Sequence, residues 1–253
     1  MNLIGLHTFV AKEISRFLRV FIQSLVSPWI NAFLYIFIFG VVVGTRIDTI
    51  AGVKYIDFVL PGILMMNLIS ASFSQSSSSL YFQRFARHIE EILVSPLSYV
   101  EMVVGYVVGA LARALVVGIG VYVIAIIFSA ATMAHVLLFL FYSIAISIMF
   151  ALVGLIIGLW ADNFEQLFIF NTFVITPLIF LGGMFNSVTM LPENIQTIAR
   201  LNPFFYFVDG LRYSMIGIRE SNPWVGFGII VILLVSLLII VWILFKRGWR
   251  IRT

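Results

Sequence analysis

The sequence predicts an all-α membrane protein with six transmembrane helices. The 253-residue chain is 62% hydrophobic and only 10% charged, whereas soluble domains have about 45–50% apolar and about 25% charged residues. Six continuous apolar stretches also reach the roughly 20 residues that a helix needs to cross a bilayer, and they lack the in–out alternation of barrel strands. Together these observations exclude a soluble enzyme, a disordered chain and a nucleic-acid-binding module.

The six predicted spans are separated by polar or charged segments. They cover residues 21–44, 55–80, 99–128, 134–160, 164–183 and 224–245. The first is longer than the apolar region of a signal peptide, about 7–15 residues, so we expect it to be retained. We expect the serine run Ser76–Ser79 to end the second span. The five tryptophans lie near predicted span ends, where amphipathic rings prefer the membrane interface.

The distribution of lysine and arginine predicts the orientation of the spans. Nine of these residues fall on the side that holds both termini, and five fall on the opposite side. Because cytoplasmic segments of membrane proteins are enriched in Lys and Arg, both termini are expected in the cytoplasm.

The N-terminal segment, residues 2–23, predicts an amphipathic helix, and we assign residues 1–20 to an interfacial helix. Its apolar residues recur at intervals of three or four and share one face, while the basic residues lie opposite. Such a helix buries its apolar side in the headgroup region and keeps its basic side in water. The candidate residues are Lys12, Glu13, Arg16 and Arg19. Two interpretations of this helix stay open. It is either a membrane anchor alone, or an anchor that also docks a cytoplasmic partner.

The loop after the second span predicts a short helix over residues 84–96. Arg87 and Glu91 are four residues apart and are expected to pair on its surface. Pro96 is expected to end the helix, because the residue before proline is disfavoured in the helical region. The helix also carries Phe85, Ile89 and Leu93, which we expect to be buried in a partner's groove. The alternative is a solvated loop.

The long connection of residues 184–222 predicts two short or re-entrant helices, since it is too polar to span and too apolar for a plain loop. We expect one helix after Leu191–Pro192 and another after Asn202–Pro203, because proline is well tolerated at a helix start. The aromatic run 204–207 is expected to anchor the neighbouring spans at the interface. A place in the outer leaflet, or at the rim of an exit, is the alternative.

The sequence predicts neither catalytic residues nor a metal site. It has no glycine-rich phosphate loop followed by lysine, its three histidines lie in separate segments, and it has no cysteine. Arg113 is the one charged residue deep within a predicted span. Burying a charge in the bilayer costs free energy unless the side chain has a partner or lines a water-filled cavity. Arg113 is expected either to line a polar route that favours anionic head groups, or to make a structural ion pair or hydrogen bonds to helix carbonyls.

Three pairs of glycines four residues apart predict close helix packing within the bundle or at a subunit interface. The pairs are at positions 40 and 44, 105 and 109, and 154 and 158.

Two sequence patterns are specific enough to compare with known families. The first is the loop sequence RHIEEILVSPLS at residues 87–98, and the second lies before the last span. That second pattern comprises Leu191, Pro192, Asn202, Pro203, Gly210, Leu211 and Arg212. With the basic N-terminal helix and six spans, the chain resembles the permease subunit of ABC-2 type exporters nearly end to end. It is similar to the nodulation lipo-oligosaccharide exporter permease and to its uncharacterised enterobacterial relatives.

The resemblance implies a homodimer in the bacterial inner membrane, surrounded by lipid, with two cytoplasmic ABC ATPase subunits. Those subunits would hold ATP and Mg²⁺, so no cofactor, enzymatic activity or nucleic-acid partner is expected of this chain. The implied ATPase-coupling residues are Arg84, Arg87, His88, Glu90, Glu91, Ser95 and Pro96. The implied outer-gate residues are Leu191, Pro192, Asn202, Pro203 and Arg212.

The implied activity is export of an amphiphilic, lipid-linked or glycan-type substrate or drug. The alternative is an ATP-independent channel or an ion-coupled carrier, which would need a carboxylate or a polar ring near the bilayer midplane.

Overall fold

A computed structural model describes residues 2–47, 49–128 and 133–251. Within these residues, six helical segments are long and apolar enough to cross a membrane, which confirms the predicted fold class. They are Ile22–Gly40, Tyr55–Phe85, Tyr99–Ile127, Val136–Trp160, Phe164–Leu181 and Pro223–Arg247. Their bounds agree with the predicted spans to within a few residues, except that the second continues to Phe85.

Two spans are not uniform α-helices. The first consists of η1 (Ile22–Val26), α2 (Ser27–Phe37) and η2 (Ile38–Val43). The fifth consists of α7 (Phe164–Phe170), η3 (Asn171–Ile175) and α8 (Thr176–Leu181). The segments η1 and η3 are π-helical, and each directly precedes an α-helix with proline in its first turn. Proline has no N–H to donate, so a carbonyl of the preceding turn loses its usual partner.

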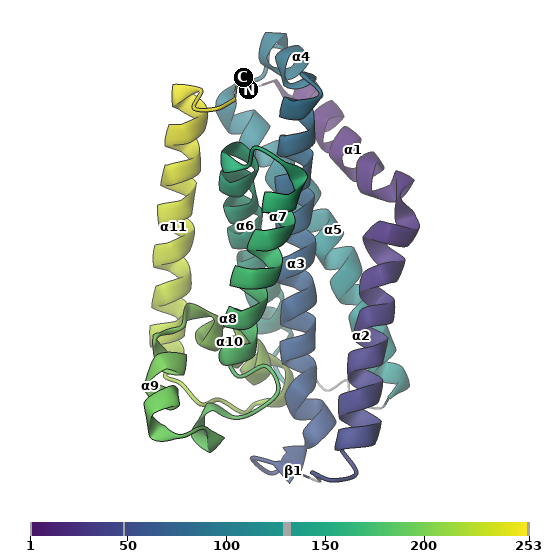
Figure 1. The fold of residues 1–253 in the computed structure, drawn as a ribbon, viewed down its shortest axis with the longest axis vertical. Helices are drawn as coiled ribbons and strands as arrows, with labels where there is room; N and C mark the ends of the chain where they lie inside the picture. Colours follow the sequence, from purple (N-terminus) through teal and green to yellow (C-terminus); the bar gives the residue numbers. More distant parts are fainter. Residues whose placement is uncertain (1, 48, 129–132, 252–253) are drawn as a thin grey trace.

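Helix α3 (Tyr55–Phe85) is the centre of the bundle. It packs against α5 (Tyr99–Ile127) and α6 (Val136–Trp160), while α11 (Pro223–Arg247) packs mainly against α6 (Figure 1). The most apolar stretch of α3 is 78% buried, compared with 11% for α11. Thus α3 forms the core, and α11 leaves most of its surface for lipid.

The serine run does not end the second span, and that prediction is wrong. Ser76–Ser79 continue α3, because their small side chains pack closely and satisfy their own hydroxyls. The Ser76 hydroxyl donates to a carbonyl one turn earlier. Gly154 and Gly158 of α6 face Ser76 and Ser77, so this predicted glycine pair packs within the chain. Small residues on both helices let the two backbones approach.

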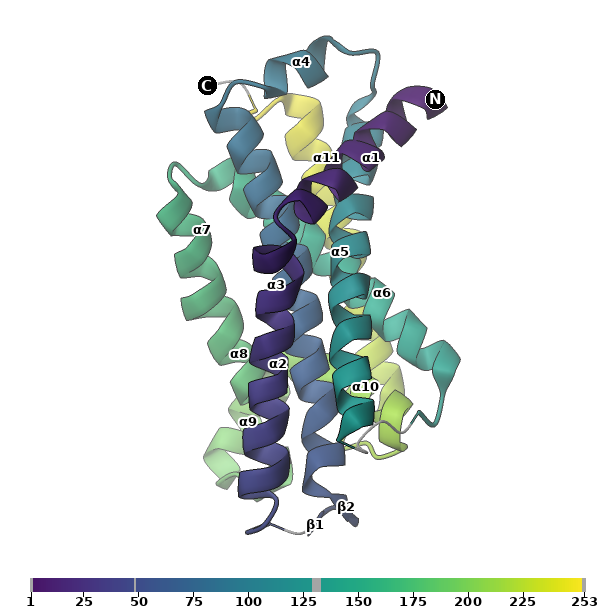
Figure 2. The same ribbon diagram turned by 90° about the vertical axis from the view of Figure 1, so that its right-hand side faces the viewer.

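The two ends of the bundle differ. Helices α1 (Leu3–Arg19) and α4 (Ile89–Val94) lie at the end that also holds both termini, which we call the α4 end (Figures 1 and 2). The opposite end, the α9 end, holds η4 (Val188–Met190), α9 (Glu193–Leu201) and α10 (Pro203–Ile216). It also holds strands β1 (Thr49–Ile50) and β2 (Val53–Lys54), an unexpected antiparallel pair in which Thr49 faces Lys54.

The aromatic run at the start of α10 does not anchor the protein at the membrane interface. Phe204, Phe205 and Phe207 are 6%, 3% and 1% exposed. Phe204 packs against Phe150 of α6, with ring centroids 5.3 Å apart. The expectation of an interfacial anchor is therefore wrong for these three rings, because α10 packs against α3 and α6.

Candidate functional site

The segment predicted as one helix over residues 84–96 is divided in the structure. Arg84 belongs to the last turn of α3, and α4 covers only Ile89–Val94. Between them Arg87 has a positive φ of 57°, which interrupts the helix. The expected pairing of Arg87 with Glu91 on one helix is therefore not formed, and neither residue is in an ion pair of the described chain.

Arg84 faces the bundle rather than a partner. It is 5% exposed, and its Nη1 donates to the carbonyls of Gly158 (2.8 Å) and Ala161 (3.3 Å) at the end of α6. These bonds hold the end of α3 against the α6–α7 turn. Arg84 thus supports the segment that carries α4 without itself forming the exposed surface.

The remaining coupling candidates are grouped at the tip of the α4 end. Their exposed members, together with the exposed Val94, define what we call the α4 surface: Arg87, His88, Glu90, Glu91, Val94 and Pro96. Val94 is 87% exposed, although it is apolar. Ser95 is only partly exposed, and its hydroxyl donates to the carbonyl of Ile92. The α4 surface therefore combines two adjacent carboxylates with a bare apolar side chain.

Most apolar residues of α4 are covered by this chain itself. Ile89 and Ile92 are buried, and Leu93 is partly buried, in a cluster that includes Phe9, Tyr106 and other residues of α1, α5, α6 and α11. The prediction that Ile89 and Leu93 need a partner's groove is therefore wrong, and only Phe85, 69% exposed, stays open. Because α4 contacts α3 and shares this buried cluster, a force on α4 acts on the bundle.

The polar side of α1 is partly enclosed by protein. Phe9, Glu13 and Phe17 form a buried stripe along α1, while Lys12 and Arg19 are exposed. Gly105 and Gly109 of α5 face Phe9 and Glu13, so the second glycine pair seats α1. The expected wet polar side is corrected for Glu13 and for the partly buried Arg16, because α1 packs this side against α5 and hydrogen-bonds to α3.

Glu13 is the centre of a buried network. Its carboxylate oxygens lie 2.8 and 2.7 Å from the Ser79 hydroxyl, and Gln83 Nε2 donates to one of them at 3.0 Å. The Tyr106 hydroxyl donates to Gln83 Oε1, which extends the network to α5. Burial raises the pKa of the Glu13 carboxyl, while nearby Arg16 opposes that rise. The network fixes α1 onto two spans.

Arg16 is also less exposed than an interfacial residue would be. Its Nη2 donates to the Ser78 hydroxyl at 2.8 Å, and burial lowers its pKa. The sequence periodicity does not reveal these contacts, because the acceptors belong to the serine run of α3.

Arg113 lines a cavity inside the bundle. The cavity has a volume of about 530 Å³ and lies between α2, α3, α5 and α8. Arg113 Nε and Nη2 donate to the carbonyl of Ser24 at 3.3 Å, and Nη1 donates to Gln75 Oε1 at 3.5 Å. Pro28 leaves the Ser24 carbonyl without its usual α-helical donor, so Arg113 supplies one. Both interpretations of Arg113 thus have support, since it bonds to a helix carbonyl and also lines a polar cavity.

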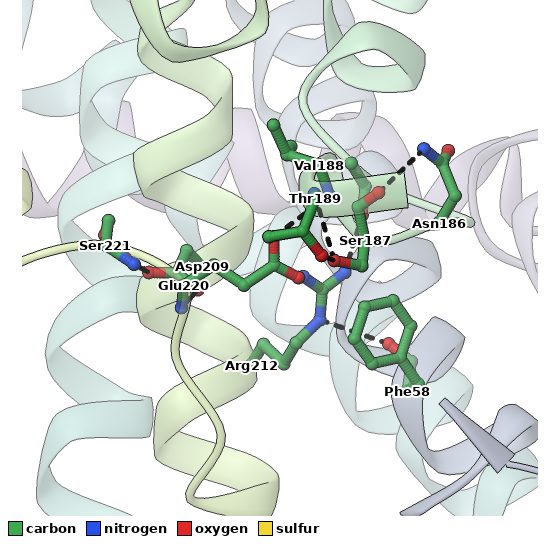
Figure 3. Close-up of polar contacts among 10 residues, drawn as sticks. Phe58, Asn186, Ser187, Val188, Thr189, Asp209, Arg212, Glu220 and Ser221 are labelled. Atoms are coloured by element: carbon green, nitrogen blue, oxygen red, sulfur yellow. Dashed lines mark hydrogen bonds and ion pairs between the residues drawn. The ribbon is translucent and has the colours of Figure 1, made fainter. Parts of the chain in front are cut away.

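At the α9 end, Arg212 is the hub of a second polar cluster (Figure 3). It is 1% exposed, and its guanidinium carbon lies 3.8 Å from the centroid of the Phe58 ring. It donates to the carbonyls of Phe58 and Gly183, and its Nη1 lies 3.6 Å from Glu220 Oε1. Glu220 Oε2 in turn accepts from the Val188 amide at 2.9 Å. This cluster ties α10 to α3, to the segment between α8 and α9, and to the α10–α11 connection.

The other outer-gate candidates have local structural roles. Asn202 caps α10 by accepting from the Phe204 amide, and it donates to the carbonyl of Leu178 at 2.6 Å. Pro203 begins α10. Pro192 directly precedes α9, and the carbonyl of Leu191 accepts from Gln196.

Asp209 and Glu220 belong to the same cluster but were not among the predicted site residues. Asp209 accepts from the backbone amides of Glu220 (2.7 Å) and Ser221 (3.0 Å), which holds the α10–α11 connection in place. Arg212 in the sequence pattern is the signal that pointed to this region, since a buried guanidinium needs acidic partners.

In the part of the chain that the structure describes, no group of three acidic or histidine side chains is placed to hold a metal ion. Membrane-length helices, a polar cavity within the bundle and a charged surface at one end together define an integral membrane protein of the multi-pass class.

Comparison with known proteins gives the family. The ABC-2 type transporter family matches residues 5–216. The chain is 38% identical over 251 residues to the inner membrane transport permease YadH of Escherichia coli (strain K12), covering 99% of this chain and 98% of YadH. It is 28% identical over 205 residues to nodulation protein J of Rhizobium meliloti (strain 1021), covering 79% and 76% of the two chains. The chain belongs to the ABC-2 type transporter family, and it is a multi-pass inner-membrane transport permease.

Proposed function

We propose that this chain is the transmembrane subunit of an ATP-driven exporter. Two copies would form the membrane part, and two separate cytoplasmic ABC ATPase subunits would supply the energy. The substrate would be an amphiphile, such as a lipid-linked or glycan-type molecule or a drug. In this arrangement ATP and Mg²⁺ are bound by the partner, and this chain performs no hydrolysis.

The observation that carries the proposal is the α4 surface. It presents Glu90 and Glu91 to solvent on a short helix that contacts α3 and buries its other side in a cluster with residues of α1, α5 and α11. Such a helix transmits displacement, because close-packed interiors do not absorb a shift at one contact. A partner that binds the exposed side and moves would therefore tilt the spans behind it.

The position of the basic residues supports a cytoplasmic α4 end. Helix α1, which carries Lys12, Arg16 and Arg19, and the last turn of α11, which carries Lys246 and Arg247, lie at this end together with both termini (Figure 2). Lys and Arg are enriched on the cytoplasmic side of membrane proteins. The α9 end, with the cluster around Arg212, would then close the route on the outer side.

The proposal is tested by replacing Glu90 and Glu91 together with alanine in the reconstituted complex of permease and cognate ATPase. We expect transport and substrate-stimulated hydrolysis to fall at least about tenfold, which corresponds to a loss of about 1.4 kcal/mol in coupling. The matched control is the double alanine variant of Glu165 and Glu193, which lie outside the α4 surface. Full transport and stimulation in the Glu90/Glu91 variant, or solute flux without ATP, would contradict the proposal.

A further inference from the structure

Arg113 carries a positive charge that no carboxylate balances in the described part of the chain. The ion pairs of these residues are Arg212–Glu220 and Arg250–Asp162, both distant from Arg113 in the sequence and on other elements. Every hydrogen-bond partner of Arg113 is neutral. A charged group at this depth is costly unless it meets an opposite charge or water. Arg113 therefore has an unsatisfied preference for an anion.

The guanidinium also has spare hydrogen-bonding capacity. Arginine has five N–H donors, and here the contacts to Ser24 and Gln75 are all long, at 3.3–3.5 Å. A planar guanidinium binds phosphate or carboxylate through paired, charge-assisted hydrogen bonds that are shorter and stronger than these. An arriving anion could thus be bound by the free donors while the Ser24 contact keeps the side chain in place.

The cavity next to Arg113 has the properties of a head-group site. Its polar lining consists of side chains that offer amide and hydroxyl groups but no charge: Asn31, Asn67, Ser70, Ser74 and Thr176. Its apolar lining includes Leu34 of α2 and Ile38 of η2, which are 47% and 45% exposed, so the cavity reaches the outer surface of the first span. A ligand with a polar anionic head and an apolar tail fits both parts of this lining.

We propose that this cavity binds the anionic head group of an amphiphile, a phosphate or a carboxylate, and that Arg113 is its charged ligand. This inference rests on the proposed function, which names an amphiphilic substrate, and it specifies that the substrate is anionic. The tail of the ligand lies along the exposed apolar residues of α2. Gln75 joins the site to α1, because its Oε1 accepts from Arg113 while its Nε2 donates to the Glu13 carbonyl at 3.3 Å.

The test measures binding to the purified permease without ATPase, so its result is independent of the coupling assay. Dodecyl phosphate is titrated into the permease in a neutral maltoside detergent, and bound probe is counted by native mass spectrometry. Dodecanol and inorganic phosphate serve as probes that carry only the tail or only the anion. We expect dodecyl phosphate to bind at least about tenfold more tightly than either one.

Variants separate the charge of Arg113 from its structural role. R113Q is expected to weaken dodecyl phosphate binding at least about tenfold, and R113K less than R113Q, because lysine keeps the charge but not the paired donors. S74D keeps Arg113 and places a carboxylate in the same cavity, so it should weaken binding to a similar extent. R46Q removes an exposed arginine at the α9 end and should bind like the wild type.

Two results would overturn the proposal. One is equal binding of dodecyl phosphate by the wild type, R113Q and S74D. The other is binding of inorganic phosphate or dodecanol as tight as that of dodecyl phosphate, which would show that the cavity does not recognise an anionic amphiphile. The binding assay does not involve the ATPase. If the Glu90/Glu91 variant keeps full transport, the proposed function is contradicted, but the binding results still decide whether Arg113 binds an anionic head group.

Discussion

Replacing Glu13 with alanine is expected to release α1 from the bundle. Glu13 is fully buried, and its carboxylate accepts from Ser79 and Gln83. E13A would leave both donors buried without an acceptor, and each unsatisfied polar group costs about 1–3 kcal/mol. Docking of α1 should therefore weaken by about 2–6 kcal/mol. Since 1.4 kcal/mol is a factor of ten, the open fraction should rise at least about 30-fold.

Hydrogen exchange of residues 3–19, followed by mass spectrometry in detergent, measures this opening. E13Q is the matched variant, because it keeps the volume and one acceptor oxygen, and it should exchange far more slowly than E13A. K12Q removes an exposed charge of the same helix and should exchange like the wild type. Unchanged exchange of α1 in E13A would refute the reasoning that the buried network holds this helix.

The same network predicts a pH dependence. Burial raises the pKa of Glu13 above its ordinary value of 4.5. The protonated form is therefore favoured in the docked state, and this contribution is fully present below pH 4.5 and is lost as the pH rises through the raised pKa. Exchange of α1 should become faster over that range in the wild type. In E13Q the profile should show no such step beyond the intrinsic pH dependence of exchange.

The remaining predictions concern packing and the α9 end. A Cβ at Gly154 would lie 2.1 Å from Ser76 Oγ, whereas one at Gly228 meets nothing within 4 Å. G154A should lower stability by about 1–3 kcal/mol, and G228A should leave it unchanged or raise it by up to about 1 kcal/mol. Thermal unfolding, monitored by tryptophan fluorescence, measures the stability of both variants. Equal changes in their unfolding temperatures would contradict the close α3–α6 packing. R212A should destabilise the protein by about 3–5 kcal/mol by leaving Glu220 buried and unpaired. The exposed control R219A should stay within about 0.5 kcal/mol in the same measurement, and similar losses for the two variants would exclude Arg212 as the hub.

The spans were predictable because the bilayer selects for long apolar helices, and hydropathy records that selection directly. Their bounds hold even where the backbone departs from the α-helix, as in η1 and η3. The second span shows the limit of this signal. Serine is a polar residue, so a run of serines lowers the hydropathy and indicates the end of a span. In α3, however, the serine hydroxyls bond to the helix's own carbonyls, and the small side chains pack against Gly154 and Gly158.

The polar networks could not be predicted from local patterns. Glu13 lies on a helix whose periodicity indicates a membrane surface, and only the packing of α1 on α5 reveals that Gly109 makes room for its side chain. In the same way, Ile89 and Leu93 form an apolar stripe that indicates a partner, yet a cluster with residues of α1, α5, α6 and α11 buries Ile89 and partly buries Leu93 within the chain. In both cases the deciding contacts join segments far apart in the sequence.

The most direct test of the account asks which compartment the α4 surface faces and what covers it. The chain has no cysteine, so a single one can be introduced at Glu90 of the α4 surface or at Arg200 of α9. Each variant is treated with a membrane-impermeant maleimide in spheroplasts and in inside-out vesicles, with and without the cognate ATPase. The account predicts that E90C reacts only in inside-out vesicles and is protected by the ATPase, while R200C reacts only in spheroplasts. Reaction of E90C in spheroplasts, or labelling that the ATPase does not reduce, would contradict it.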